Sequence, residues 1–267
     1  MRYLAPLRGA VESTAFERQP LADWLAPIEW LQGEDWPSIE ALNAARPAGM
    51  HERFVAQTAE LLADGLHYEQ RIAKQGEIAT RVANWHDLFN ALIWLRHAGL
   101  KRALNAQQMA EIAHMGTKAR SRPQYALTHF DEAGVIVVLR DRALLDLWDA
   151  HDWHGLFWRE RAAWLSGRAS VTVFGHALLE HALTPDKLLV GKALVFLTKA
   201  DGSRAEAVCA AAIAGGRVLR DPLELRPLPL SGLPGWHPDN GREAFHRSAA
   251  CYQARRAGRE YPSPGQL

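Results

Sequence analysis

The chain has 267 residues, of which 48% are hydrophobic and 23% charged, as in an ordinary globular protein. Its 31 basic and 30 acidic residues leave a formal charge of +1, so no basic field favours nucleic acid, which we regard as an unlikely partner. The N-terminus lacks the apolar core of a secretory signal, the runs VIVVL and ALVFL are too short to span a bilayer, and two cysteines form no disulfide framework. We therefore expect a cytoplasmic protein without a membrane partner.

Helices are predicted for the first part of the chain, over about residues 17–65. Apolar residues in PLADWLAPIEWLQ and ERFVAQTAELLADGL recur every three or four positions, and Pro37 and Pro47 separate the segments. The next segment, HYEQRIAKQGEIAT, is short and contains a glycine, which predicts a loop or a weak β-hairpin.

The segment NWHDLFNALIWLRHAG predicts an amphipathic helix with a defined start. Asn84 is suited to cap its N-terminus, and Asp87 three positions later completes a pattern similar to a capping box. Gly99 predicts the end of this helix, and LNAQQMAEIAHMG predicts a second short helix. Asn84 and Asp87 are thus interpreted as structural caps.

Alternating strands and helices are predicted beyond residue 120. YALTHFDEAGVIVVL predicts a β-hairpin, in which Asp131 opens the turn and Gly134 takes a positive φ. ASVTVFGHALLEHAL predicts a strand that turns into a helix at Gly175, and ALVFL predicts a strand. SRAEAVCAAAIAGG predicts a helix with a capping box formed by Ser203 and Glu206.

These elements together predict a mixed, helix-rich α+β fold, with helices packed around a small sheet that includes the β-hairpin. Residues 1–220 are expected to form a single domain with a helical N-terminal part. Residues 221–267 are rich in proline and are expected to form an extended tail docked on that domain.

Polar residues gather where the helix after Asn84 begins. His86 and Asn90 lie one helical turn apart, beside the apolar face. The helix dipole disfavours a charged His86 in the first turn, and a neutral imidazole can act as a metal ligand or a base. Arg81 precedes the free amide groups of that helix, where an arginine can bind a phosphate or a carboxylate. The alternative is that Arg81 pairs with a neighbouring acid.

A second candidate cluster follows the strand that ends before Gly175. His176 and Glu180 lie four residues apart on one helical face, so both could bind one metal ion, or Glu180 could orient an imidazole. A buried histidine bonded to a carboxylate is an equally good interpretation. Asp131 and Glu132 could bind a cation, although turn chemistry alone explains Asp131. The zinc motif H-E-x-x-H, the nucleophile motif G-x-S-x-G and the phosphate-binding loop are absent from the sequence.

Five segments in this order, TRVANWHDLFNALIW, KRALN, ALTHFDEAGVIVV, VFGHALLEHAL and LPGWHPDN, resemble a bacterial family, domain-of-unknown-function family 3025. The resemblance implies a bacterial cytoplasmic domain and no particular reaction. One departure is Tyr125, where the family usually carries Asp or Asn. The residues that match its signature positions are Arg81, Asn84, Trp85, His86, Asp87, Asn90, Lys101, Asn105, Thr128, Asp131, Glu132, His176 and Glu180.

Two functions are compatible with these residues. The first is a hydrolase that uses a divalent metal ion or general acid/base catalysis and acts on a phosphate- or carboxylate-bearing substrate. The second is a non-catalytic protein-interaction module, in which the polar residues are helix caps and a buried network; the oligomeric state stays open. For the hydrolase, the catalytic candidates are His86, His176, Glu180 and Asp131, the anion-binding candidates are Arg81, Asn90 and Lys101, and the metal-ligand candidates are His86, His176, Glu180, Asp131 and Glu132.

Overall fold

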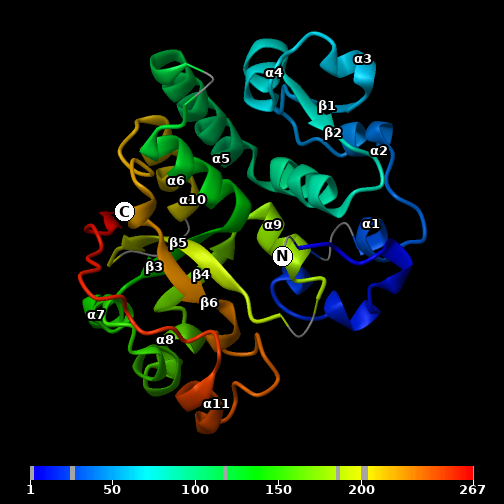
Figure 1. Ribbon diagram of the computed structural model, residues 1–267. Helices are drawn as coiled ribbons and strands as arrows, with labels where there is room; N and C mark the ends of the chain where they lie inside the picture. Colours follow the sequence, from blue (N-terminus) through cyan, green and yellow to red (C-terminus); the bar gives the residue numbers. More distant parts are fainter. Residues whose placement is uncertain (1–2, 25–27, 117–118, 185–186, 200–203, 267) are drawn as a thin grey trace.

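A five-stranded mixed sheet forms the centre of the molecule in the computed structural model, which describes residues 3–24, 28–116, 119–184, 187–199 and 204–266 (Figure 1). Its strands are β3 (Gly134–Leu139), β4 (Ala169–Val173), β5 (Val190–Leu197), β6 (Arg226–Pro229) and β7 (Gly265–Gln266). The order is β4-β3-β5-β6, and β7 pairs with the end of β5. β3 runs parallel to β5 and antiparallel to β4.

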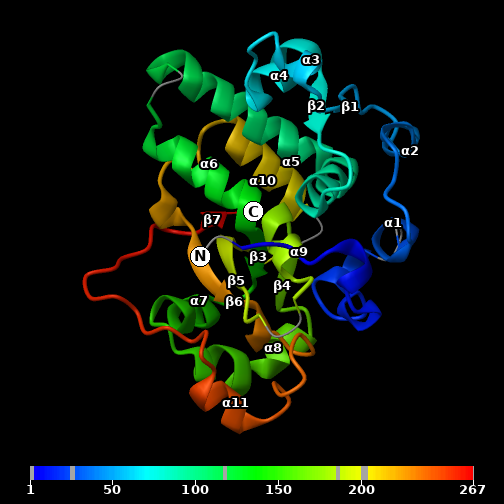
Figure 2. The ribbon, with the colours of Figure 1, turned by 45° about the vertical axis from the view of Figure 1, so that its right-hand side comes forward.

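Helices cover both faces of this sheet, as Figures 1 and 2 show. One face carries α5 (Trp85–Met115), α6 (Arg122–Ala133) and α10 (Ala205–Ala214), and the other carries α7 (Arg142–Asp149) and α8 (Arg161–Leu165). Beyond α8 lies α11 (Glu243–Ser248). Every residue of β3 is therefore buried, which explains why its sequence is a continuous apolar run with no polar alternation.

A smaller parallel sheet lies beside α5 in the upper part of Figure 1. It consists of β1 (Arg53–Ala56) and β2 (Glu77–Thr80), which α3 (Ala59–Leu62) and α4 (Tyr68–Gln75) connect. α1 (Ile28–Gln32) and α2 (Ile39–Ala44) precede it. The buried Arg71 binds the backbone oxygen of Leu61 at 2.7 Å and the carboxylate of Glu77 at 3.2 Å, and so holds α3 and β2 on α4.

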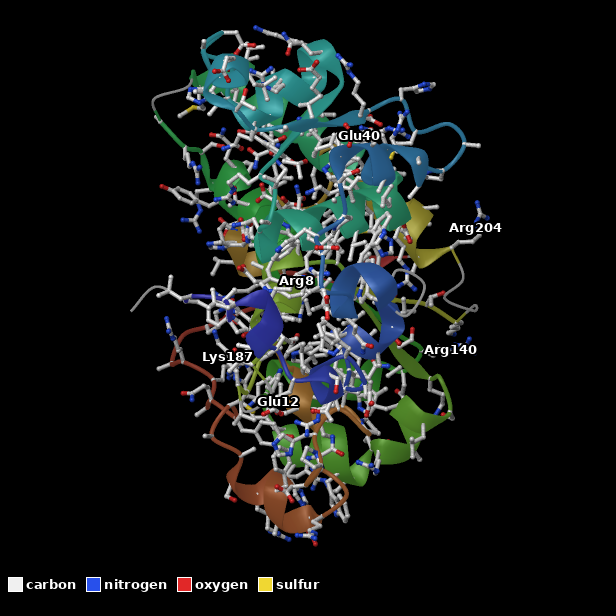
Figure 3. The ribbon with its side chains drawn as sticks, turned by 90° about the vertical axis from the view of Figure 1, so that its right-hand side faces the viewer. Arg8, Glu12, Glu40, Arg140, Lys187 and Arg204 are labelled. Carbon is white, nitrogen blue, oxygen red and sulfur yellow. The ribbon has the colours of Figure 1, made fainter. Side chains whose placement is uncertain are left out.

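The N-terminal segment packs against the start of α5. Arg8, labelled in Figure 3, donates to the backbone oxygens of Trp30 at 2.8 Å and Gly33 at 2.9 Å. Its guanidinium also lies 4.5 Å from the centre of the Trp36 ring. The Trp85 indole donates to the Pro6 oxygen at 3.1 Å, so the segment is fixed beside the first turn of α5.

The structure confirms the helix-rich α+β class, but the predicted β-hairpin is wrong. Residues 122–133 form α6, because Ser121 and Gln124 make a reciprocal capping box and the buried Leu127 and Phe130 follow at helical spacing. Gly134 begins β3 with a φ of −67°, not a positive value. Glycine is needed there because a Cβ atom would lie 2.1 Å from the Phe130 oxygen.

Other boundaries also differ from those predicted. Residues 68–75 form α4 rather than a loop or hairpin. Gly76, with a φ of 65°, ends this helix and is not part of a hairpin turn. The helix predicted to end at Gly99 ends two residues earlier: α5 consists of two helices that meet at a kink at His97, where φ is −127° and ψ is 38°, so the second helix begins before Asn105. The strand that turns into a helix at Gly175 is confirmed as β4 and α9 (His176–His181). Ser203 of the predicted capping box lies outside the described residues.

The segment from Asp221 onward takes part in the main sheet. β6 pairs antiparallel with the first half of β5, and β7 pairs with Phe196 and Leu197 at its end. The buried Arg226 binds Asp149 at 2.6 Å and the Pro262 oxygen at 2.8 Å, which ties the last residues to α7. Among the helices of the described residues, none combines the length and apolar character needed to cross a bilayer.

The close backbone approach at Gly175 predicts a strong effect of Gly175→Ala. A Cβ atom at Gly175 would lie 2.4 Å from the Ala133 Cα and 2.5 Å from the Gly134 nitrogen, both backbone atoms that cannot turn aside. We expect a loss of about 1–3 kcal/mol in the free energy of unfolding, measured with urea. Gly99→Ala is the control, because it fills open space within α5 and should stabilise by about 0.5–1 kcal/mol. Equal stability of the two variants would contradict the close approach.

Candidate functional site

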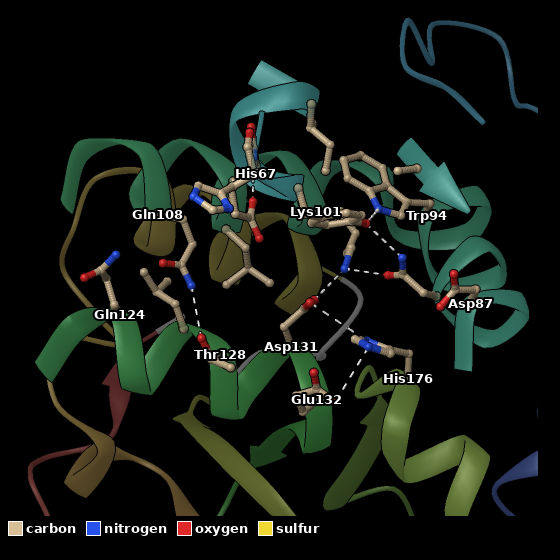
Figure 4. Close-up of a pocket in the computed structure, with 18 of the residues that line it drawn as sticks. His67, Asp87, Trp94, Lys101, Gln108, Gln124, Thr128, Asp131, Glu132 and His176 are labelled. Atoms are coloured by element: carbon tan, nitrogen blue, oxygen red, sulfur yellow. Dashed lines mark hydrogen bonds and ion pairs between the residues drawn. The ribbon is translucent and has the colours of Figure 1, made fainter. Parts of the chain in front are cut away.

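Three helix ends meet beside the Gly175 contact. α6 ends with Asp131 and Glu132, α9 begins with His176, and the first turn of α5 contributes His86. In Figure 4, the side chains of Asp131, Glu132 and His176 point toward one another below Lys101. The structure thus brings together residues that are about 90 positions apart in the sequence, as the 3.1 Å contact between His86 and His176 shows.

The two imidazole rings face each other through corresponding atoms. His86 Nε2 lies 3.1 Å from His176 Nε2. Behind each ring stands a carboxylate: Glu180 Oε2 is 3.0 Å from His86 Nδ1, and Asp131 Oδ2 is 3.9 Å from His176 Nδ1. His176 Nδ1 is buried and has no hydrogen-bond partner. Glu180 therefore orients His86, and not the His176 that precedes it by one turn of α9.

Glu132 supplies a third group at the same point. Its Oε2 lies 3.7 Å from His176 Nε2, and the ligand atoms of His86, His176 and Glu132 all lie within 4.8 Å of one another. Ligand atoms of a tetrahedral zinc ion at about 2.0–2.2 Å are separated by roughly 3.3 Å, so small side-chain movements would admit an ion. Two imidazoles with one carboxylate are a common ligand set for catalytic metals, because they leave coordination positions open. Asp131 and Glu180 lie behind the rings instead.

The protonation of the two rings differs. The hydrogen bond with Glu180 raises the pKa of His86, and burial opposes this shift only in part. Burial lowers the pKa of His176 to about 3. The surroundings therefore favour the protonated form of His86 and the neutral form of His176. The Glu180 carboxylate thus opposes the helix dipole, which was expected to disfavour a charged His86.

A buried ion pair adjoins this cluster. Lys101 is only 3% exposed, and its Nζ donates to Asp131 Oδ1 at 2.6 Å and to Asn90 Oδ1 at 2.9 Å. Burial alone would lower the pKa of Lys101, but Asp131 outweighs burial and the pKa is raised. Burial would likewise raise the pKa of Asp131, yet Lys101 and the histidines lower it. Both groups are therefore charged, and each compensates the other.

Asn90 connects this ion pair to Tyr68 of α4. Its Nδ2 donates to the Tyr68 hydroxyl at 2.8 Å, and the Trp94 indole donates to the same oxygen at 3.2 Å. Burial raises the pKa of Tyr68 to about 12, so the hydroxyl keeps its proton. Among the described residues no acceptor is found for that proton, although the oxygen accepts two hydrogen bonds. Tyr68 can therefore donate to a ligand.

These side chains line a cavity of about 530 Å³. Beyond Tyr68, its wall continues with Glu69, whose Oε2 accepts from Asn105 at 2.6 Å, and with Gln108, which donates to Thr128 at 3.3 Å. A second cavity, about 980 Å³, lies under the N-terminal residues and also reaches His86 and Glu132. His86 therefore borders both cavities, whereas His176 borders only the first. The apolar part of the first cavity consists of Ile72, Ala79, Leu104, Ile112, Ala119 and Leu127.

The residues on both sides of His86, namely Arg81, Asn84 and Asp87, have structural partners. Asn84 occupies the N-cap of α5 and accepts from the Asp87 amide at 3.0 Å. Asp87 does not close a capping box; its Oδ2 accepts from the Arg81 amide at 2.6 Å, and its Oδ1 from the Arg81 guanidinium at 2.7 Å. The structure thus shows the ion pair that was the alternative to anion binding by Arg81, although this side chain is 48% exposed and lines both cavities.

Sequence reasoning assigned no role to Tyr68, Glu69 or Trp94. The signal that was present is the sequence HYEQ, because Gln70 accepts from the His67 amide at 3.3 Å and marks the start of α4. Other polar residues lie elsewhere: His151 binds the Gln253 oxygen, and His154 binds Glu243. Tyr125 is 46% exposed on the outer face of α6, so the departure from the family pattern does not alter the cavity wall.

The buried ion pair predicts a large effect of Lys101→Met. This change leaves the Asp131 carboxylate buried without its cation, and we expect a loss of about 3–5 kcal/mol in the free energy of unfolding. The double variant Lys101→Met, Asp131→Leu removes both charges and should recover part of that loss. Urea unfolding measures both. If the single variant loses less than the double variant, the pair does not compensate charge as described.

The hydrogen bond between Glu180 and His86 predicts a pH dependence in metal-free protein. A histidine whose folded pKa exceeds the unfolded value of about 6.5 stabilises the fold fully below that pH. This contribution is lost as the pH rises through the folded value. The stability advantage of the wild type over Glu180→Gln should thus be greatest in acid and should decrease toward pH 8, and NMR titration should show a lower His86 pKa in the variant. An unchanged His86 pKa would contradict the assignment.

Comparison with known protein families gave one match. A family model described as "Protein of unknown function (DUF3025)" matches residues 52–256, which contain all the residues at the facing imidazoles and the whole lining of the 530 Å³ cavity. No curated protein and no solved structure matched the chain. The chain belongs to the DUF3025 family.

Proposed function

We propose that this protein is a metal-dependent hydrolase. A divalent ion would be held by His86 Nε2, His176 Nε2 and the carboxylate of Glu132. The observation that carries the proposal is the convergence of these ligand atoms within 4.8 Å, on an accessible cavity, with a carboxylate behind each imidazole. Glu180 would fix the ring of His86 and increase its basicity, as is general for carboxylates that hydrogen-bond to metal-bound histidines, whereas Asp131 lies 3.9 Å from His176 Nδ1 without a hydrogen bond.

The remaining residues of the cavity would act on the substrate. A divalent ion in this position lowers the pKa of a bound water and polarises a carbonyl or phosphoryl group. Tyr68 and Lys101 each have an N–H or O–H group available to donate to a substrate oxygen, since Lys101 uses two of its three protons and Tyr68 uses none. Asn90 accepts from Lys101 and donates to Tyr68, which makes it the residue that positions both donors.

The arrangement of charges bears on the substrate expected from the sequence. Arg81 is paired with Asp87, and Lys101 with Asp131, so neither cation is available to neutralise a free phosphate or carboxylate. A negative charge on the reacting group would instead be met by the metal ion. The proposed substrates are accordingly compounds whose scissile acyl or phosphoryl group binds at the ion.

A protein-interaction module is the second candidate. Leu4 and Leu7 on the N-terminal segment are 85% and 82% exposed, which a partner could cover. A protein-interaction module does not require a cavity in which His86 and His176 face each other. The hydrolase therefore receives more support from the geometry.

Metal content provides the direct test. Protein purified without a histidine tag or chelator should contain about one divalent ion per chain by elemental analysis. His86→Ala and His176→Ala should remove the ion, and Glu180→Gln should weaken its binding about 10–100-fold, because the orienting carboxylate is lost. His114→Ala is the matched control, since this exposed histidine lies on the same helix as His86.

The contradicting outcome is equally clear. Cooperative unfolding of each variant, checked first, excludes a simple loss of the fold. If folded wild-type protein takes up no Zn²⁺, Mn²⁺ or Fe²⁺ on dialysis, the contact between His86 and His176 is a structural hydrogen bond. The interaction module would then be the better account of the protein.

A further inference from the structure

The 530 Å³ cavity is lined by more carboxylates than there are cations paired with them. Lys101 pairs with Asp131 at 2.6 Å and Arg81 with Asp87 at 2.7 Å. Of the carboxylates that line the cavity, Glu132 and Glu69 form no ion pair with a lysine or arginine among the described residues. Glu132 lies at the proposed metal, whereas Glu69 belongs to α4, and the one further arginine of the lining, Arg120, is exposed to solvent.

Glu69 has only a neutral partner. Its Oε2 accepts one hydrogen bond from Asn105 Nδ2 at 2.6 Å, and the same amide nitrogen also donates to the Glu69 backbone oxygen at 2.9 Å. Within the described part of the chain, no ion pair includes this carboxylate. Burial raises the pKa of Glu69, and the charge of Lys101, which is paired with Asp131, lowers it by less than burial raises it.

We propose that the Glu69 end of the cavity is a subsite for a protonated amine of the substrate. The substrate would then be an acyl or phosphoryl compound that carries an amino group several bonds from the scissile bond. This inference deepens the proposed function and rests on it, because the metal ion would fix the other end of the substrate. An ammonium group supplies the positive charge and the donors that Glu69 lacks.

The apolar part of the cavity wall suits such a molecule. Leu104, Leu127 and Ile72 line the cavity together with Glu69, and they can pack against methylene groups. The phenol ring of Tyr68 precedes Glu69 on α4, and an aromatic face also favours a cation. Lys101 would repel the amine only weakly, because Asp131 compensates its charge. A neutral hydroxyl in place of the amine would bind Asn105 and Glu69 without needing the charge of the carboxylate.

Matched pairs of chelating ligands test the subsite. The probes are ω-amino alkyl hydroxamates with two to six methylene groups and the alkyl hydroxamates of the same lengths, titrated by calorimetry into the zinc-loaded full chain. The hydroxamate binds the metal, and the paired compounds differ only in the ammonium group. At one chain length the amine should bind about 10-fold more tightly than its partner in the wild type, as expected for a hydrogen-bonded charge pair. In Glu69→Gln that gain should disappear, while the alkyl hydroxamate binds unchanged.

The outcomes separate this inference from the proposed function. If the alkyl hydroxamates bind and no chain length gains from the amine, or if the gain survives in Glu69→Gln, the subsite is overturned and the metal site stands. If the protein takes up no zinc, the proposed function fails. The subsite is then decided by n-butylammonium alone, which should raise the Tm of the wild type but not that of Glu69→Gln; equal shifts in both proteins overturn it.

Discussion

The close approach of two backbone segments at Gly175 determines where the polar groups of this protein meet. Because Gly175 has no side chain, α9 begins directly against the junction of α6 and β3, with the Ala133 Cα only 2.4 Å from the position of a Cβ. Glu132 precedes this contact on one segment, and His176 follows it on the other. A larger residue would separate them. The short distance between these two side chains is thus a consequence of packing between main chains.

The second constraint is electrostatic. The cavity wall places four carboxylates, Glu69, Asp87, Asp131 and Glu132, near the cations Arg81 and Lys101, and the two cations are already paired. Glu69 and Glu132 are partly buried, and withdrawing a carboxylate from water without a cation is unfavourable for folding. Such an arrangement is expected where a protein binds a positively charged species, since the ligand restores the balance. A metal ion at Glu132 and an amine at Glu69 would each satisfy this requirement.

Much of the local structure follows from the sequence, for identifiable reasons. Asn84 caps α5 because its side chain accepts from the Asp87 amide, and the strand before Gly175 turns into α9 as its pattern indicates. The hairpin prediction is wrong because the turn residues DEAG continue a helix that the capping box of Ser121 and Gln124 starts. Turn preferences are local, and here the buried Leu127 and Phe130 favoured continuing the helix.

The site was predictable only in part. The sequence selects His86, His176, Asp131, Glu132 and Lys101 as candidates, and the spacing pairs Glu180 with His176. Glu180 binds His86 on another helix, not the histidine one turn before it, because α9 presents both side chains to α5. For Tyr68 and Glu69 the sequence contains no pattern that indicates a site, only the capping pattern of His67 and Gln70 at the start of α4. Their role depends on α4 lying across α5, a contact between residues more than 20 positions apart.

The central claim is that His86, His176 and Glu132 bind one metal ion. Anomalous diffraction from a crystal of zinc-loaded protein, recorded on both sides of the zinc absorption edge, tests it most directly. The account predicts one strong peak about 2.0–2.2 Å from both Nε2 atoms and from the Glu132 carboxylate, with Glu180 and Asp131 still behind the rings. A map without a peak there, with the two Nε2 atoms still in direct hydrogen-bond contact, would contradict it.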